Sequence, residues 1–215
     1  MKSLLLKDLY NMRTNVRYLL VMMLVFAVAF IPNGYLNFLF ITSTMFSVMM
    51  VSTFSYDEYA KWNRYALVMP IQKRDIVAGK FLMAVLFSLF GVFLGGICSV
   101  IGGLVMGELT LGGGDAWREI LFSIDLSFCI AVLFGTTMIP LLFQFGVEKA
   151  RMITVGVVAV PVLLLYAFLK FSDGAAFLNG EKNLVTLMIL FPVFVLIWGS
   201  VMYKISCRIF FQKEF

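Results

Sequence analysis

The sequence contains no histidine and only three cysteines, and charged residues make up just 13% of its 215 positions. Without histidine, the chain lacks the commonest general base and the commonest transition-metal ligand. Cys98, Cys129 and Cys207 lie far apart and form no CxxC pair, a spacing that favours neither a zinc site nor a disulfide framework. We therefore expect no metal site and no histidine-based catalysis.

Apolar residues take the place of the missing charge. Hydrophobic residues form 62% of the chain, whereas a soluble domain is typically about 45–50% apolar and about 25% charged. So few charged side chains cannot cover the surface of a soluble globule of this length. The composition therefore excludes a soluble protein and predicts a membrane protein.

Long charge-free intervals locate the predicted membrane spans, because a helix needs about 20 apolar residues to cross a bilayer. The interval from Tyr18 to Tyr56 is long enough for two crossings and contains Pro32-Asn33-Gly34, a strong turn signal. The sequence predicts an all-α polytopic fold, a single transmembrane domain over residues 1–215. Its six expected transmembrane helices lie at about 17–33, 35–55, 80–106, 121–144, 152–170 and 184–205.

The basic residues predict the orientation of these helices. All but three of the 17 Lys and Arg residues fall on one predicted side, the exceptions being Arg118, Lys170 and Lys182. Since cytoplasmic loops carry an excess of Lys and Arg, both termini are expected in the cytoplasm. The net charge of +5 is thus a topology signal, and no nucleic-acid partner is expected.

Residues 2–16 differ from a membrane span. Leu5, Leu9, Met12 and Val16 recur at helical spacing, while polar residues such as Lys7 and Asp8 are turned elsewhere. This pattern is typical of an amphipathic helix lying in the membrane interface. We expect an anchoring role for this helix.

The segment 56–79 carries the strongest functional signal. The sequence predicts a short helix from about Asp57 to Val68, with Asp57 and Glu58 at its positive dipole end and within pairing distance of Lys61. A connector between membrane helices can be a few residues long, whereas this one is long and rich in aromatic and charged residues that suit a soluble partner. A connector that merely snorkels along the interface is the alternative.

This segment and the six-helix topology resemble the ABC-2 type permeases, in particular the small single-domain subunits of phenol-soluble modulin and lantibiotic-immunity exporters. The resemblance covers the whole chain in topology but only Tyr56 to Lys80 in motif. It implies that the segment forms a coupling helix that docks on an ATPase. The positions it places at or beside that contact are Asp57, Glu58, Lys61, Trp62, Arg64 and Tyr65, followed by Pro70, Arg74 and Lys80 in the return to the next helix.

The resemblance also implies partners. No GxxxxGK[ST] phosphate-binding motif occurs in the sequence, so the ATPase, with its ATP and Mg²⁺, is expected on a separate ABC ATPase subunit. Two permease chains would be needed, either a second copy or a paralogue. A bacterial cell membrane is the expected location.

Apart from basic residues at or next to the ends of the predicted spans, Asp125 is the only charged residue within them, and an intramembrane charge is by default a functional-site hypothesis. Asp125 and Gln144 are therefore candidates for a substrate path, although Asp125 lies close enough to one end of its helix to sit among lipid headgroups. Fourteen Met and 23 Phe favour an adaptable apolar lining. The expected substrate is hydrophobic or amphipathic, such as a peptide or a lipid-like molecule.

The function predicted from the sequence is thus the permease subunit of an ABC exporter, a transport subunit that is not itself an enzyme, with no catalytic residue and no cofactor bound by this chain. The alternative is an ion-coupled secondary transporter or channel, which usually places charges near the membrane midplane. An intramembrane protease of the H-E-x-x-H type is excluded by the absence of histidine.

Overall fold

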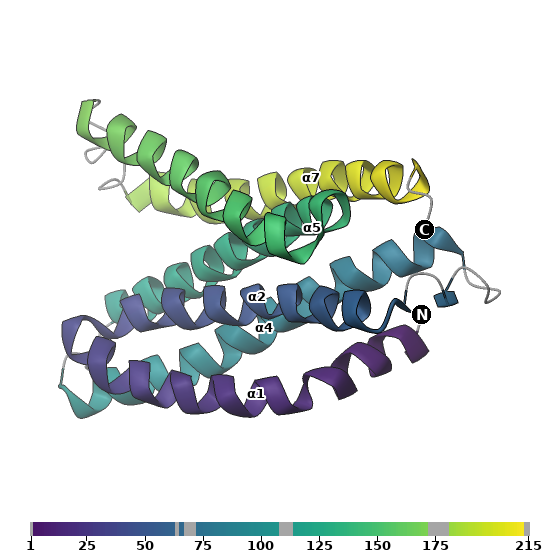
Figure 1. The fold of residues 1–215 in the computed structure, drawn as a ribbon. Helices are drawn as coiled ribbons and strands as arrows, with labels where there is room; N and C mark the ends of the chain where they lie inside the picture. Colours follow the sequence, from purple (N-terminus) through teal and green to yellow (C-terminus); the bar gives the residue numbers. More distant parts are fainter. Residues whose placement is uncertain (1, 63–64, 67–71, 108–113, 172–180, 213–215) are drawn as a thin grey trace.

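The computed structural model describes residues 2–62, 65–66, 72–107, 114–171 and 181–212. Within these ranges the chain is helical and contains no strand, which confirms the all-α prediction. The elements are α1 (Lys2–Phe30), the 3-10 turn η1 (Ile31–Asn33), α2 (Tyr35–Tyr59), α4 (Lys73–Val105), α5 (Gly114–Phe171) and α7 (Glu181–Gln212). The helices lie side by side, and both chain termini are at one end of the bundle, here called the terminal end (Figure 1).

The predicted turn between the first two helices is confirmed. Pro32 lies in the first turn of η1, where its missing N–H needs no partner. Gly34 then adopts a φ of 123°, a conformation that side-chain-bearing residues rarely take. Together these residues end α1 and start α2 in the opposite direction.

The six-span count is not confirmed. Among the described residues, the helices long and apolar enough to cross a membrane are the four at Tyr35–Tyr59, Lys73–Val105, Trp117–Ala150 and Met188–Gln212. Helix α1 would add a fifth span, but it is bent by 55° between Leu4–Arg13 and Asn15–Phe30. The expected span 152–170 is helical as part of α5 but is not among the four. The structure therefore supports a multi-pass helical membrane protein.

Helix α2 is the centre of the bundle and packs against α1, α4 and α5. Glycines on α4 allow the closest of these approaches. A Cβ atom on Gly91 would lie 2.7 Å from the Cβ of Phe46, and one on Gly95 would lie 3.0 Å from the Cβ of Thr42. The Gly91-x-x-x-Gly95 pattern thus serves helix packing, as small residues spaced four apart commonly do in membranes.

Serine hydroxyls join α2 to α5. Ser47 Oγ donates a hydrogen bond of 2.6 Å to the carbonyl oxygen of Ala131, one turn along from a weaker contact between Ser43 and Ser127. The same Ser47 Oγ lies 2.8 Å from where a Cβ on Gly135 would be. Polar contacts of this kind fix the register of helices that meet within apolar surroundings.

The largest buried apolar cluster lies toward the terminal end and combines residues from all the long helices. Its centre contains Met50 of α2, Met83 of α4, Phe143 of α5 and Phe210 of α7. Met12 of α1 is also fully buried in it. The thioether side chains fill the irregular space between crossing helices, as methionine commonly does in protein cores.

Helix α5 is broken at Gly146, where φ is 76° and ψ is 174°. The chain turns back on itself at this break, so α5 is two helices joined at a sharp corner (Figure 1). The corner falls between the expected helices 121–144 and 152–170. A single glycine therefore forms the break in α5, and the crossing of the membrane by 152–170 stays a prediction.

Candidate functional site

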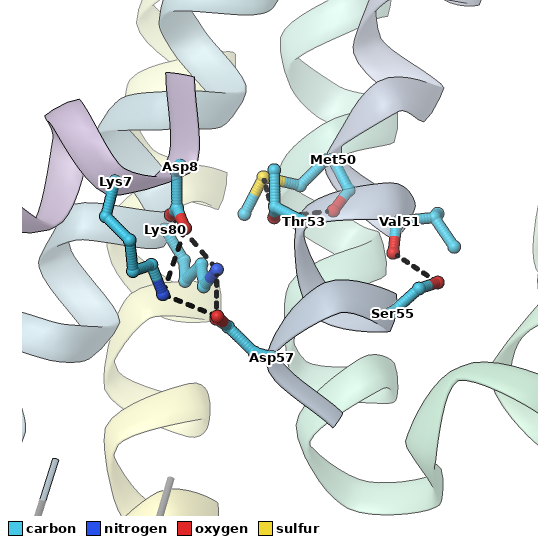
Figure 2. A network of polar contacts seen from close by, with 8 residues as sticks. All are labelled: Lys7, Asp8, Met50, Val51, Thr53, Ser55, Asp57 and Lys80. Carbon is cyan, nitrogen blue, oxygen red and sulfur yellow. Dashed lines mark hydrogen bonds and ion pairs between the residues drawn. The ribbon is translucent and has the colours of Figure 1, made fainter. Parts of the chain in front are cut away.

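Four charged side chains meet where α1, α2 and α4 converge at the terminal end. Lys7 and Asp8 come from α1, Asp57 comes from the last turn of α2, and Lys80 comes from α4. Figure 2 shows the two lysines and two aspartates pointing toward one another. We call these four residues the charge ring.

Positive and negative groups alternate around the charge ring. Asp57 accepts from both lysines, with its two oxygens 2.5 Å from Lys7 Nζ and 2.5 Å from Lys80 Nζ. Asp8 Oδ2 lies 3.0 Å from Lys80 Nζ. The fourth side is the longest, because Asp8 Oδ1 lies 3.2 Å from Lys7 Nζ without the alignment of a hydrogen bond. Each charge therefore has two neighbours of opposite sign, and the ring is neutral as a whole.

The charge ring is almost completely removed from solvent. Lys80 is 4% exposed, Asp8 is 5% exposed and Asp57 is 6% exposed. Only Lys7 retains substantial access, with 22% of its side chain exposed. Buried charges are costly to desolvate and are tolerated when they are paired with good geometry. The closed alternation of the ring meets that requirement.

Aromatic rings complete the coordination of the two lysines. Lys7 Nζ lies 4.3 Å from the centre of the Trp62 ring, and Lys80 Nζ lies 5.0 Å from the centre of the Phe54 ring. These are cation–π distances, and such contacts strengthen when the cation is desolvated. Trp62 follows α2 in the chain, so the ring is linked directly to the segment that leads toward α4.

The position of Asp8 corrects the expected orientation of the first helix. Asp8 was predicted to turn away from the apolar face, yet it is buried, and Leu9 of the predicted apolar face is exposed. The apolar anchors are Leu4 and Met12, which lie on the same side as Asp8. Pairing with Lys80 makes this possible, because it neutralises an acid that would otherwise remain in water.

The end of α2 also differs from the prediction. The expected short helix beginning at Asp57 is wrong in its start, since α2 continues through Tyr59 and places Asp57 and Glu58 at its negative dipole end. Residues 63–64 and 67–68 of that expected helix lie outside the described residues. Lys7 of α1 and Lys80 of α4 offset the unfavourable interaction of the Asp57 carboxylate with the helix dipole.

Lys61 does not pair along a helix as expected. It follows the end of α2 with a φ of 48°, in the left-handed region that often terminates helices. Its N–H donates to the carbonyl oxygen of Glu58. This backbone turn directs the chain back toward α1 and brings Trp62 over Lys7.

Glu58 binds the corner of α5. Its Oε2 accepts a hydrogen bond of 3.1 Å from the N–H of Val147, the first residue after the break at Gly146. A carboxylate in this place satisfies a free N–H at a helix start and lies at the positive end of the helix dipole. The neighbouring acids Asp57 and Glu58 therefore hold different elements, α1 with α4 and α5 respectively.

The remaining positions implied by the family resemblance fall into three groups. Trp62 is half-buried against Lys7, whereas Tyr65 and Arg74 are exposed. Arg64 and Pro70 lie outside the described residues. The structure thus brings together Asp57, Trp62 and Lys80, and leaves Tyr65 and Arg74 on the surface.

The two candidates for a substrate path are not brought together. Asp125 is half-buried in α5, and Gln144 is exposed near the corner of the same helix. Their role remains a prediction. Within the described ranges, no group of three His, Cys, Asp or Glu side chains lies close enough to hold a metal ion.

Lys7, Asp8 and Gly146 are the site residues that the sequence analysis missed. Lys7 and Asp57 are 50 positions apart, and Asp8 and Lys80 are 72 positions apart. No local spacing rule connects them. The only sequence signal for the four charged residues was their scarcity, since the chain has very little charge.

These features define a multi-pass helical membrane protein with a buried charge ring beneath an aromatic connecting segment. The sequence matches the family described as ABC-2 family transporter protein over residues 3–211. The chain therefore belongs to the ABC-2 transporter family, and is an ABC permease subunit in general terms. No curated protein and no solved structure matches it.

Proposed function

We propose that this chain is the transmembrane subunit of an ABC exporter whose ATPase is a separate polypeptide that docks on the connecting segment, residues 60–72 between α2 and α4. The observation that carries this proposal is the exposed aromatic surface at the terminal end. Tyr59 is 89% exposed and Tyr65 is 61% exposed, beside the exposed Lys61. Tyrosine combines apolar area with a polar tip and is enriched where proteins bind one another.

The surroundings of this surface suit a contact that transmits movement. The charge ring lies directly beneath it, because Trp62 covers Lys7. Glu58, at the same end of α2, holds the corner of α5. A displacement of the connecting segment would therefore reach α1 and α4 through Trp62 and the charge ring. It would reach α5 through Glu58.

The proposed orientation places the terminal end in the cytoplasm. This end carries both termini and the connecting segment, and the excess of Lys and Arg falls on the same predicted side. ATP and Mg²⁺ would then bind to the partner ATPase on that side. A second copy of this chain, or a paralogue, would complete the transporter in a bacterial cell membrane.

The proposed cargo is hydrophobic or amphipathic, and it is moved outward. An apolar groove of about 380 Å³ lies between α1 and α2. Met22, Met45 and Met49 line it, and Asn15 and Ser52 add polar atoms. Flexible methionine side chains with a few polar groups suit a molecule that has both characters.

Co-purification tests the docking proposal. We expect the tagged chain to retain a P-loop ATPase encoded by a neighbouring reading frame when both are expressed together. The double variant Tyr59→Ala/Tyr65→Ala should lose most of the bound ATPase, because two exposed aromatic contacts are removed. Its own stability should not change, since neither side chain is buried.

The matched control is Trp117→Ala, which removes an exposed aromatic residue near the start of α5, at the opposite end of the bundle. This variant should retain the ATPase as the parent does. Retention of the ATPase by the double tyrosine variant at the parental level would contradict docking on the connecting segment.

A further inference from the structure

The charge ring joins three helices through contacts that depend on one another. Lys7 and Asp8 lie in Leu4–Arg13, the part of α1 before its 55° bend. Asp57 and Lys80 anchor that part to the end of α2 and to α4. Because every charge contacts two opposite charges, moving any one helix away would break two ion pairs at once.

We propose that the charge ring locks Leu4–Arg13 to α2 and α4 as one rigid body, and that the bend in α1 is the hinge between this body and Asn15–Phe30. Lys7, Asp8, Asp57 and Lys80 are then positioning residues. This inference rests on the proposed function for the source of the movement, which is docking and nucleotide binding by the ATPase. The locking itself requires no partner.

Burial and charge together support a rigid joint. Three of the four side chains are nearly inaccessible, so separating them would leave unpaired charges in a low-dielectric environment. Leu4 and Met12 add buried apolar contacts on the same side of the segment. Ion pairs and apolar contacts on one face therefore hold Leu4–Arg13 more firmly than lipid alone holds an interfacial helix.

The contact between Trp62 and Lys7 links the connecting segment to the joint. Trp62 belongs to the connecting segment and stacks on Lys7, the ring member with the most solvent access. A displacement of Trp62 by a docked partner acts on Lys7 first. Through Lys7 the displacement reaches α1, although α1 is remote from the connecting segment in the sequence.

Spin-label distances in lipid nanodiscs test this joint. The three native cysteines are replaced by alanine, and labels are placed on exposed positions in two pairs. The pair Tyr10→Cys/Leu89→Cys spans the charge ring, and the pair Val28→Cys/Leu89→Cys spans the bend. Double electron–electron resonance then reports each distance distribution with and without the ATPase trapped with ATP and vanadate.

Two ring variants separate charge from shape. The neutral variant is Lys7→Gln/Asp8→Asn/Asp57→Asn/Lys80→Gln, which removes all four charges and keeps polar side chains at the four positions. The reversed variant is Lys7→Asp/Asp8→Lys/Asp57→Lys/Lys80→Asp, which restores the alternation with opposite signs. Reversing fewer than four positions would always place like charges in contact, so full reversal is the matched control.

Without the ATPase, the first pair should give a narrow distribution in the parent and the reversed variant, and a broad one in the neutral variant. With the trapped ATPase, the first distance should stay unchanged in the parent while the second shifts. An equally narrow first distribution in the neutral variant would overturn the joint. A shift of the first distance in the parent, or no shift of the second, would overturn the hinge. Absence of ATPase binding would refute the proposed function alone, because the partner-free comparison still decides the joint.

Discussion

Replacing Asp57 with alanine should lower the free energy of unfolding by about 3–5 kcal/mol, the usual cost of removing one partner from a buried ion pair. Asp57 is the only acid that contacts both lysines at 2.5 Å. Its loss would leave Lys7 and Lys80 sharing Asp8, so the nearly inaccessible Lys80 would carry an uncompensated charge. Thermal or denaturant unfolding in detergent micelles, followed by circular dichroism, measures this loss.

The control for Asp57→Ala is Glu119→Gln, which neutralises an exposed acid on α5 and should change stability by about 0.5 kcal/mol or less. The double variant Asp57→Asn/Lys80→Gln should recover a large part of the loss, because Lys7 and Asp8 remain as a neutral pair. Parental stability of Asp57→Ala would show that the ring does not hold the helices together.

Gly146→Ala should also destabilise the chain, by about 1–3 kcal/mol for placing a side chain in a backbone region that is essentially restricted to glycine. The φ of 76° and ψ of 174° at this corner belong to that region. In addition, the new Cβ would lie 3.1 Å from Glu58 Oε1 and push the carboxylate away from the N–H of Val147. The same unfolding measurement reports the effect.

Two other glycines separate these contributions. Gly107 also has a positive φ, of 72°, but a Cβ there would meet nothing within 4 Å. Gly107→Ala should therefore cost less than Gly146→Ala. Gly199 lies inside α7 with open space around it, so Gly199→Ala should be neutral or stabilising. If all three variants behave alike, the contact between Gly146 and Glu58 has no energetic role.

The sequence predicted the elements of the fold that depend on local composition. The charge-free intervals correctly located α2, α4 and α7, and Pro32-Asn33-Gly34 correctly marked the first turn. These features follow from the chemistry of neighbouring residues. A proline and a glycine favour a turn wherever the rest of the chain lies, and apolar runs favour membrane helices in the same way.

The charge ring could not be predicted in the same way. The sequence analysis paired Asp57 with Lys61 by helical spacing, whereas the structure pairs it with Lys7 and Lys80. Which distant helix supplies a lysine depends on the packing of α2 against α1 and α4. That packing is set by close approaches such as Gly91 on Phe46, and no spacing rule encodes it.

The burial of Asp8 could not be predicted from the sequence pattern either. An amphipathic pattern places an acid on the polar face, because an isolated charge costs free energy when it is buried. The presence of Lys80 removes that cost. A one-dimensional pattern therefore assigns the wrong face whenever a distant residue neutralises a charge.

The scarcity of charge in this chain makes its placement informative. In a protein with 13% charged residues, four of them are concentrated in one ring where α1, α2 and α4 converge (Figure 2). This concentration of ion pairs suits a joint between helices that must stay closed when force is applied to it. We propose that this force comes from an ATPase bound to the connecting segment.

Site-specific photo-crosslinking tests that claim most directly. A benzophenone amino acid is incorporated in place of the exposed Tyr65 of the connecting segment, or in place of Trp117 near the other end, and the co-expressed complex is irradiated in native membranes. We predict a crosslink to the ATPase from position 65 and none from position 117. A complex that forms but gives no crosslink from position 65, or gives one from position 117, would contradict it.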